Sequence, residues 1–307
     1  MTRLLFLIML FFTQVGAMAQ DEGVPFIMIL GIAQDGGYPH MGCNKPCCAR
    51  AWANDTASRF VVSLAIVDPA SKKWWLIEAT PDIKYQLRYF QQLTGGRFNY
   101  LPDGIFLTHA HIGHYTGLMQ LGREVMNTSK IPVYSLPKMK DFLENNGPWS
   151  QLVKLENISL NLLQADSPLQ LTPGIRVTAF TVPHRDEFSE TAGFSIYTPS
   201  KKYLFIPDVN KWDKWDRNII TEVQRTDIAL LDGTFFDDTE LPGRKMSEVP
   251  HPFVKETMLL FSKTGIETTS KIHFIHLNHT NPVLWDQTKQ DSLRTAGFNI
   301  ARQGEKL

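Results

Sequence analysis

Short apolar runs recur along the chain, and a polar or glycine-rich segment follows most of them. The run at residues 24–30 is nearly continuous, whereas the run at 175–182 alternates apolar with polar positions, and both patterns are typical of strands. Runs of the same kind occupy residues 61–67, 74–78, 104–107, 131–135, 193–197, 202–206, 227–232 and 271–275. The pattern therefore predicts a protein with many strands, and the runs at 193–197 and 202–206 predict a hairpin.

Apolar residues at helical spacing follow several of these strands. Ile83, Leu87 and Phe90 repeat at intervals of three or four after Thr80, which we expect to cap a helix. Further helices are expected at residues 138–145, 211–223 and 253–262, and a hairpin within 150–174. Because the strands fall into two sets with helices outside, we expect an α+β fold, a four-layer αββα sandwich in a single domain over residues 20–307.

The first nineteen residues differ from the rest of the chain. Arg3 precedes an apolar stretch at 4–12 that is too short to span a bilayer, and residues 17–19 fit a small-x-small cleavage pattern. Residues 1–19 therefore predict a secretory signal peptide, with an uncleaved N-terminal anchor as the alternative. We expect an exported protein, periplasmic or secreted, with no stable membrane insertion after signal cleavage.

The charge balance narrows the class of partner. The 31 Lys and Arg residues equal the 31 Asp and Glu residues in number, so the formal net charge is zero. Such a chain lacks the positive excess that binds a nucleic-acid backbone. We therefore expect a small-molecule substrate and no nucleic acid, while the sequence does not indicate an oligomeric state.

Three of the nine histidines lie within six residues, directly after the predicted strand 104–107. His109 and His111 are two positions apart, so on an extended backbone they point the same way and can bind one ion. His114 follows a turn and could serve a second ion nearby. The alternative is a chance cluster of surface histidines, but histidines at this spacing in a turn have little structural purpose.

Other metal-binding side chains follow the ends of later strands. His184 comes after the strand 175–182, Asp208 after 202–206 and His276 after 271–275, with His279 in the loop beyond. Imidazole and carboxylate groups suit Zn²⁺ or a similar divalent ion, and a carboxylate can bridge two ions. The sequence therefore predicts a metal centre built from several strand ends.

The three cysteines, Cys43, Cys47 and Cys48, are also clustered, and His40 is close to them. Thiolates at this spacing could hold a small structural zinc site. The alternatives are a disulfide with one free thiol, or buried unreactive cysteines. An odd number of cysteines in an exported protein leaves at least one thiol outside any disulfide within the chain.

The histidine segment resembles the His-x-His-x-Asp-His signature of the metallo-β-lactamase fold superfamily, whose architecture is the αββα sandwich. The resemblance implies one metal held by His109, His111 and His184. It implies a second metal held by His114 and His276, with Asp208 as the bridge and His279 as the alternative to His276. Gly113 stands where the signature has Asp, which leaves the second metal without its usual carboxylate.

Two branches of this superfamily are similar to particular segments. The strand, glycine-rich loop and cysteines of residues 24–48 resemble the branch that contains pyrroloquinoline quinone synthesis protein B, whose members have a cysteine-rich structural zinc site. Thr234, Phe235 and His251 resemble the RNase Z-like phosphodiesterases, in which a histidine at a helix start donates a proton to the leaving group. Near a helix N-terminus, the helix dipole would disfavour the charged form of His251. The alternative for His251 is an ordinary residue of that helix start.

The resemblance implies an exported metal-dependent hydrolase that acts on an ester, lactone, amide or phosphodiester bond through a metal-activated water. Asp208 and His251 would be its catalytic residues. The implied cofactors are one or two Zn²⁺ in the active site and one structural zinc at the cysteines, with Fe or Mn as alternatives. The competing hypotheses are an iron-containing, oxygen-using protein like the quinone synthesis protein, and a non-catalytic metal carrier.

Overall fold

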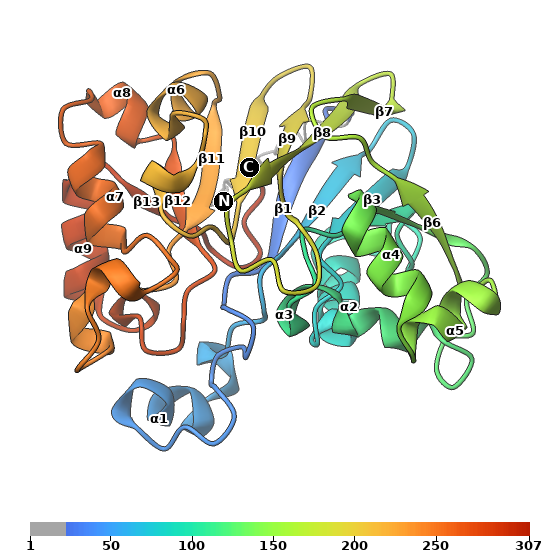
Figure 1. The fold of residues 1–307 in the computed structure, drawn as a ribbon, viewed down its shortest axis with the longest axis horizontal. Coiled ribbons are helices and arrows are strands. Elements are labelled where there is room, and N and C mark those ends of the chain that lie inside the picture. Colours follow the sequence, from blue (N-terminus) through green and yellow to red (C-terminus); the bar gives the residue numbers. More distant parts are fainter. Residues whose placement is uncertain (1–22) are drawn as a thin grey trace, which may run out of the picture.

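Two β-sheets packed face to face form the centre of the molecule (Figure 1). The computed structural model describes residues 23–307, so the predicted signal peptide at 1–19 lies outside the described residues. The first sheet has the order β1-β2-β3-β4-β5-β6, formed by Phe26–Gly31, Ser63–Asp68, Lys73–Ile77, Gly104–Phe106, Ile131–Ser135 and Ile158–Leu162. The second has the order β13-β12-β11-β10-β9-β8-β7; in chain order, β7 to β13 are Pro168–Thr172, Ile175–Val182, Thr191–Tyr197, Lys202–Ile206, Ile228–Asp232, Ile272–Ile275 and Asn299–Ile300.

Helices cover the outer faces of both sheets. In Figure 1 the helices of the first half lie on the right and those of the second half on the left, while α1 projects below the sheets. The nine α-helices of the described residues, α1 to α9, are Pro46–Ala53, Ile83–Thr94, Ile112–Tyr115, Pro137–Asn145, Trp149–Lys154, Ile219–Gln224, Val254–Leu260, Ile266–Thr269 and Gln287–Thr295. This arrangement confirms the expected αββα sandwich. None of the helices within residues 23–307 has the length and apolar character needed to cross a membrane.

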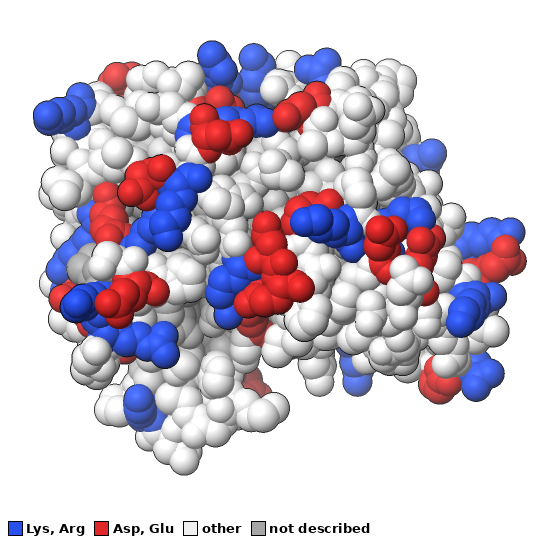
Figure 2. Space-filling model, viewed as in Figure 1, with Lys and Arg blue, Asp and Glu red and all other residues white. Residues whose placement is uncertain are grey.

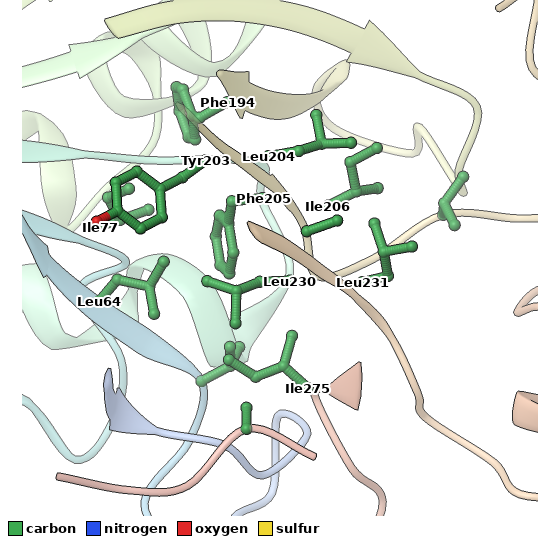
Figure 3. Packing of buried hydrophobic residues seen from close by; sticks show 14 of the residues in the cluster. Leu64, Ile77, Phe194, Tyr203, Leu204, Phe205, Ile206, Leu230, Leu231 and Ile275 are labelled. Atoms are coloured by element: carbon green, nitrogen blue, oxygen red, sulfur yellow. The ribbon is translucent and has the colours of Figure 1, made fainter. Parts of the chain in front are cut away.

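The inner faces of the two sheets form the larger hydrophobic core (Figure 3). Leu64 and Ile77 come from the first sheet, Phe205 and Leu230 come from the second, and all four are fully buried. Burying one such side chain contributes roughly 1.5–3 kcal/mol to the free energy of unfolding. The continuous run of β1 buries both faces: Ile27 and Ile29 lie in this core, and Met28 and Leu30 lie in a second cluster.

Three expectations about local structure were wrong. Residues 150–174 do not form a hairpin, because β6 and β7 belong to different sheets. The helix expected at 211–223 is reduced to a 3₁₀ turn at Trp212–Lys214 and to α6. The indole N–H groups of Trp212 and Trp215 donate to Thr257 Oγ1 and to the Thr181 carbonyl, each at 2.9 Å, and these bonds anchor the turn.

The third difference concerns the start of α2. The helix begins at Ile83 after Asp82, rather than directly after Thr80. The Thr80 hydroxyl donates to Gln86 Oε1 at 2.7 Å, and the Asp82 carboxylate accepts from the Val61 amide at 2.9 Å. Asp82 therefore connects α2 to the loop before β2 instead of capping the helix with its side chain.

The last residues of the chain run beside β1, the edge strand of the first sheet. The amide of Gly304 donates to Ile29 O at 2.8 Å, and the Ile29 amide donates to Glu305 O at 3.0 Å. The Leu307 amide donates to Ile27 O at 2.9 Å. The tail thus covers most of an edge that would otherwise leave its peptide groups unpaired.

Strand direction brings the polar loops together. β3 to β6 are parallel, as are β10 to β13, so several strands end at the same edge of the sandwich. The segments that follow β4, β8, β10 and β12 carry His109, His184, Asp208 and His276 respectively. This edge, where strands end, is where open α/β sheets commonly bind ligands.

Candidate metal centre

The first group of ligand atoms joins residues from three loops. His109, His111, His184 and Asp208 each place one ligand atom within 4.8 Å of the others. His109 Nε2 lies 2.8 Å from His111 Nδ1 and 3.5 Å from Asp208 Oδ2, and His184 Nε2 lies 3.2 Å from Asp208 Oδ1. The structure therefore brings together the whole set that the sequence suggested for one metal.

The second group contains a residue that the sequence analysis did not select. His114 and His276 share it with Asp35, which lies in the loop after β1. Asp35 Oδ1 is 3.0 Å from His114 Nε2 and 3.7 Å from His276 Nε2. Asp208 Oδ2 is 3.8 Å from both of these histidine nitrogens, so Asp208 lies between the two groups.

The outward nitrogens of four histidines face polar side chains. Thr108 Oγ1 lies 2.8 Å from His109 Nδ1, and Thr234 Oγ1 lies 2.9 Å from His276 Nδ1. Glu187 Oε2 is 3.0 Å from His111 Nε2, and Glu78 Oε2 is 3.5 Å from His114 Nδ1. Metal-binding histidines usually have such partners, because the bond fixes the tautomer and the ring orientation.

Five of the inward atoms have the opposite character, since they are buried and carry no hydrogen bond. Among the described residues these atoms are Asp35 Oδ1, His114 Nε2, His184 Nε2, Asp208 Oδ1 and His276 Nε2. Buried polar atoms are rarely left without a partner unless an ion or water completes the site. The convergence of nitrogen and carboxylate atoms from both groups fits two divalent metals such as zinc.

The electrostatics of the first group also fit a metal. Burial lowers the pKa of His109 well below its usual range and lowers the pKa of His184 to about 4, so both rings are neutral, the form that binds metal. Burial raises the pKa of Asp208, but the neighbouring His184, His251 and His276 outweigh this effect and hold its pKa well below the usual range. Asp208 is therefore ionised although it is almost fully buried.

His251 lies beside this centre and contacts a second carboxylate that the sequence analysis had assigned only to a buried strand. Its Nδ1 is 2.9 Å from Asp232 Oδ2 and 3.2 Å from both Asp208 Oδ1 and Thr234 Oγ1. Burial lowers the pKa of His251, but Asp232 and Asp208 outweigh it, so the pKa is raised. The expectation that the helix dipole disfavours the charged form was wrong, because these two carboxylates dominate.

The cysteines form a separate group, and His279 belongs to it. Cys43, Cys47, Cys48 and His279 each place a ligand atom within 4.8 Å of the others. No disulfide joins the three cysteines, and Cys43 Sγ lies 3.6 Å from Cys47 Sγ. Three thiolates and one imidazole are a common ligand set for structural zinc.

Two sequence-based alternatives are corrected by this cluster. His279 does not compete with His276 for the strand-end site, because its ring faces the cysteines instead. His40 is not part of the group of ligand atoms; its ring is tilted against that of His279 with centroids 4.3 Å apart, and its Nδ1 lies 2.9 Å from Met41 O. The fourth member of the cluster therefore comes from the far end of the chain, which sequence proximity could not reveal.

Comparison with known proteins agrees with the fold. The family model described as a beta-lactamase superfamily domain matches residues 73–306. The chain is 27% identical to coenzyme PQQ synthesis protein B of Methylorubrum extorquens strain PA1 over 311 residues, covering 92% of this chain and 99% of the relative. The protein of the same name from Xanthomonas axonopodis pv. citri is also 27% identical, with the same coverage of both chains.

Two solved structures have a similar fold. Zn(2+)-bound PqqB from Methylobacterium extorquens superposes with a TM-score of 0.73 at 24% identity, covering 92% of this chain and 99% of that chain. A diphosphatase of the PhnP family superposes with a TM-score of 0.66 at 20% identity, covering 92% and 96%. At these identities the similarity establishes the fold alone.

Proposed function

The chain belongs to the beta-lactamase superfamily, and from this premise we propose that it is an exported metal-dependent hydrolase. Its substrate would be a small molecule with an ester, lactone, amide or phosphodiester bond. One observation carries the proposal: Asp208 lies between two groups of candidate ligand atoms, and His251 lies beside them. A purely structural metal site does not need a protonatable histidine at its side.

The ligand assignment follows from the two groups. His109, His111 and His184 would hold one metal, Asp35, His114 and His276 would hold the other, and Asp208 would bridge them. Bound divalent metal would supply Lewis acidity and lower the pKa of a water molecule. Zinc is the metal we favour, because a similar protein carries Zn(2+) and because the cysteine cluster also suits zinc.

His251 would act as the general acid. Asp232 and Asp208 engage its Nδ1 and favour the protonated ring, which leaves Nε2 as the atom that can give a proton to a leaving group. Asp232 is a positioning residue in this scheme, because it contacts His251 but contributes no atom to the groups of candidate metal ligands. Thr234 supports both His251 and His276 through one hydroxyl.

A second candidate function rests on the relatives. Proteins named for coenzyme PQQ synthesis are similar to this chain over 92% of its length, so a role in cofactor synthesis, with iron and oxygen chemistry, is the competing proposal. The chemistry of the ligands favours the hydrolase. Although Gly113 stands where the signature has Asp, Asp35 supplies a carboxylate to the second group. A non-catalytic metal carrier is the remaining alternative.

The proposed location and partners follow from the sequence. The predicted signal peptide would direct export, and the mature protein would have no lasting membrane anchor. The side of the molecule in Figure 2 has basic and acidic side chains interspersed, without a broad basic surface. This distribution favours a small-molecule substrate over nucleic acid.

The test combines metal content with turnover. Wild type, His109→Ala and His251→Ala would be analysed by elemental mass spectrometry and assayed on bis(p-nitrophenyl) phosphate and on an aryl lactone, with His273→Gln as a buried-strand control. We expect zinc and turnover in wild type. His109→Ala should lose turnover and zinc of the strand-end centre but keep the zinc of the cysteine cluster, and His251→Ala should lose turnover with its zinc retained. One iron per chain would favour the cofactor-synthesis role, and bound metal without turnover on any bond type would favour the carrier.

A further inference from the structure

A cavity of about 760 Å³ lies apart from both metal-binding clusters, and none of the candidate metal ligands lines it. Its walls come from the loop before β2, from α9 and from the segment that includes β13. Two buried residues, Ile32 and Leu277, also line it. The Leu277 amide donates a 2.8 Å hydrogen bond to the Ile32 carbonyl. The volume is that of a typical small-molecule site.

The charged side chains that line this cavity are mostly basic. The lining contains three arginines, Arg59, Arg294 and Arg302, and one carboxylate, Asp55. Its formal charge is therefore +2. The whole chain has a formal net charge of zero, so the excess is local to the cavity. Guanidinium groups bind carboxylate and phosphate through paired hydrogen bonds, so the lining favours an anion.

Two of these arginines have no carboxylate partner. Within the described part of the chain, neither Arg59 nor Arg302 forms an ion pair, whereas Arg294 pairs with Asp291 at 3.0 Å. Arg59 Nη1 instead donates to the carbonyls of Thr56 and Ser58 at 2.9 and 2.7 Å, which fixes the guanidinium in the wall. Burial lowers the pKa of Arg59, so its charge is partly desolvated.

The same cavity has an aromatic wall. Phe60 and Tyr89 both line it, and their rings meet edge to face with centroids 6.1 Å apart. The Phe60 amide donates to Gln303 Oε1 at 2.8 Å, which connects this wall to the arginine-bearing segment opposite. The cavity therefore presents two aromatic rings close to fixed positive charge.

We infer that this cavity binds a small organic anion that carries a phosphate or carboxylate group together with a flat apolar part. The anion would be held by Arg59, Arg294 and Arg302, and the flat part would lie against Phe60 and Tyr89. This site is separate from the proposed hydrolytic centre and does not depend on it. Two of its lining residues are nevertheless close in sequence to candidate ligands of that centre: Ile32 is three residues before Asp35, and Leu277 directly follows His276.

The test measures binding directly by isothermal titration calorimetry with phenylphosphonate and benzoate, and with benzyl alcohol as the neutral probe. Metals also bind anions, so wild type would be compared with His109→Ala, which disables only the metal centre. We expect His109→Ala still to bind at least one of the two anionic probes and not to bind benzyl alcohol. The two anionic probes distinguish a phosphate-type ligand from a carboxylate.

Two variants, Arg302→Gln and Arg294→Gln, test whether the anion binds in this cavity. They are suitable because neither side chain hydrogen-bonds to the backbone. Arg123→Gln, at an exposed ion pair, is the matched control. Each cavity variant should weaken binding at least about tenfold, and the control should leave it unchanged. The inference is overturned if neither anion binds at millimolar concentration, if binding disappears with His109→Ala, or if both cavity variants bind as wild type does. None of these results depends on turnover, so failure of the proposed hydrolase would be seen separately.

Discussion

Asp35 occupies the space next to Gly113 that a side chain at position 113 would need. A Cβ atom built on Gly113 would lie 2.6 Å from Asp35 Cα and closer still to Asp35 Oδ1. The carboxylate therefore reaches the second group of ligand atoms from the loop after β1 instead of from the histidine segment. The glycine that looked like a missing ligand is the residue that makes room for another one.

Exchange of these two residues gives the first prediction. Asp35→Ala should remove about one metal per chain, because the second group would keep only His114 and His276 with the shared Asp208. Gly113→Asp alone should destabilise the fold through the close contact with Asp35. The double variant Asp35→Gly, Gly113→Asp should regain part of the lost metal in elemental analysis. If Asp35→Ala keeps its full metal content, Asp35 is not a ligand.

Glu187 gives the second prediction. Its carboxylate is 3.0 Å from His111 Nε2, and this bond would hold the ring so that Nδ1 faces the metal. Glu187→Gln should weaken metal binding by about tenfold, the lower end for such partners, because Glu187 is half exposed. Competition with a zinc chelator measures this affinity. Glu124→Gln, also at an exposed ion pair, serves as the control and should bind metal as wild type does.

The cysteine cluster gives the third prediction. Cys43→Ser and His279→Ala should each lose one zinc while the metals of the strand-end centre remain, because the two sites share no residue. Both variants should also melt at lower temperature, since the cluster connects α1 to the loop after β12. Metal content and thermal unfolding would be measured on the same samples. Zinc content equal to wild type in both variants would exclude a metal at the cysteines.

His273 gives the fourth prediction, on stability against pH. Burial, with a smaller effect of Lys201, lowers its pKa from 6.5 to about 4. Below pH 6.5 the unfolded chain takes up a proton that the folded chain does not bind until about pH 4, so this residue reduces stability as pH falls through that window. The loss approaches about 3 kcal/mol at the acid end.

His273→Gln should therefore flatten the pH dependence of the free energy of unfolding between pH 4 and 6.5. Urea unfolding of wild type and variant at several pH values measures the difference. Lys201→Gln should reduce the slope only slightly, because Lys201 is the lesser cause. Identical slopes for wild type and His273→Gln would contradict the assignment.

The sequence predicted those parts of the fold that depend on local pattern. The strands and most helices were visible because their apolar side chains are buried in hydrophobic clusters, and the hairpin of β9 and β10 was confirmed. The helix expected at 211–223 formed only in part, because the bonds of Trp212 and Trp215 to distant elements override helical spacing. Propensity is a weak guide where tertiary contacts of this kind compete.

The candidate site was predictable where a ligand follows a strand in a recognisable motif. Asp35 was missed because its role depends on the loop after β1 crossing α3, a contact that no spacing encodes. Asp232 was missed because it is an acidic residue at the end of a buried strand. No local feature of the sequence distinguishes an acid there that contacts a histidine from one that faces solvent. The absence of an acid at Gly113 was the local sign in the sequence that the carboxylate comes from another segment.

The pairing of residues 304–307 with β1 has a consequence for the order of events during synthesis. β1 is made early, whereas its outer neighbour is made more than 270 residues later. Until then one side of β1 presents free amide and carbonyl groups, which other chains or a holding chaperone can pair with. If the protein is exported as proposed, this delay keeps the first sheet incomplete while most of the chain emerges, and a chain released before its final residues would be prone to aggregate.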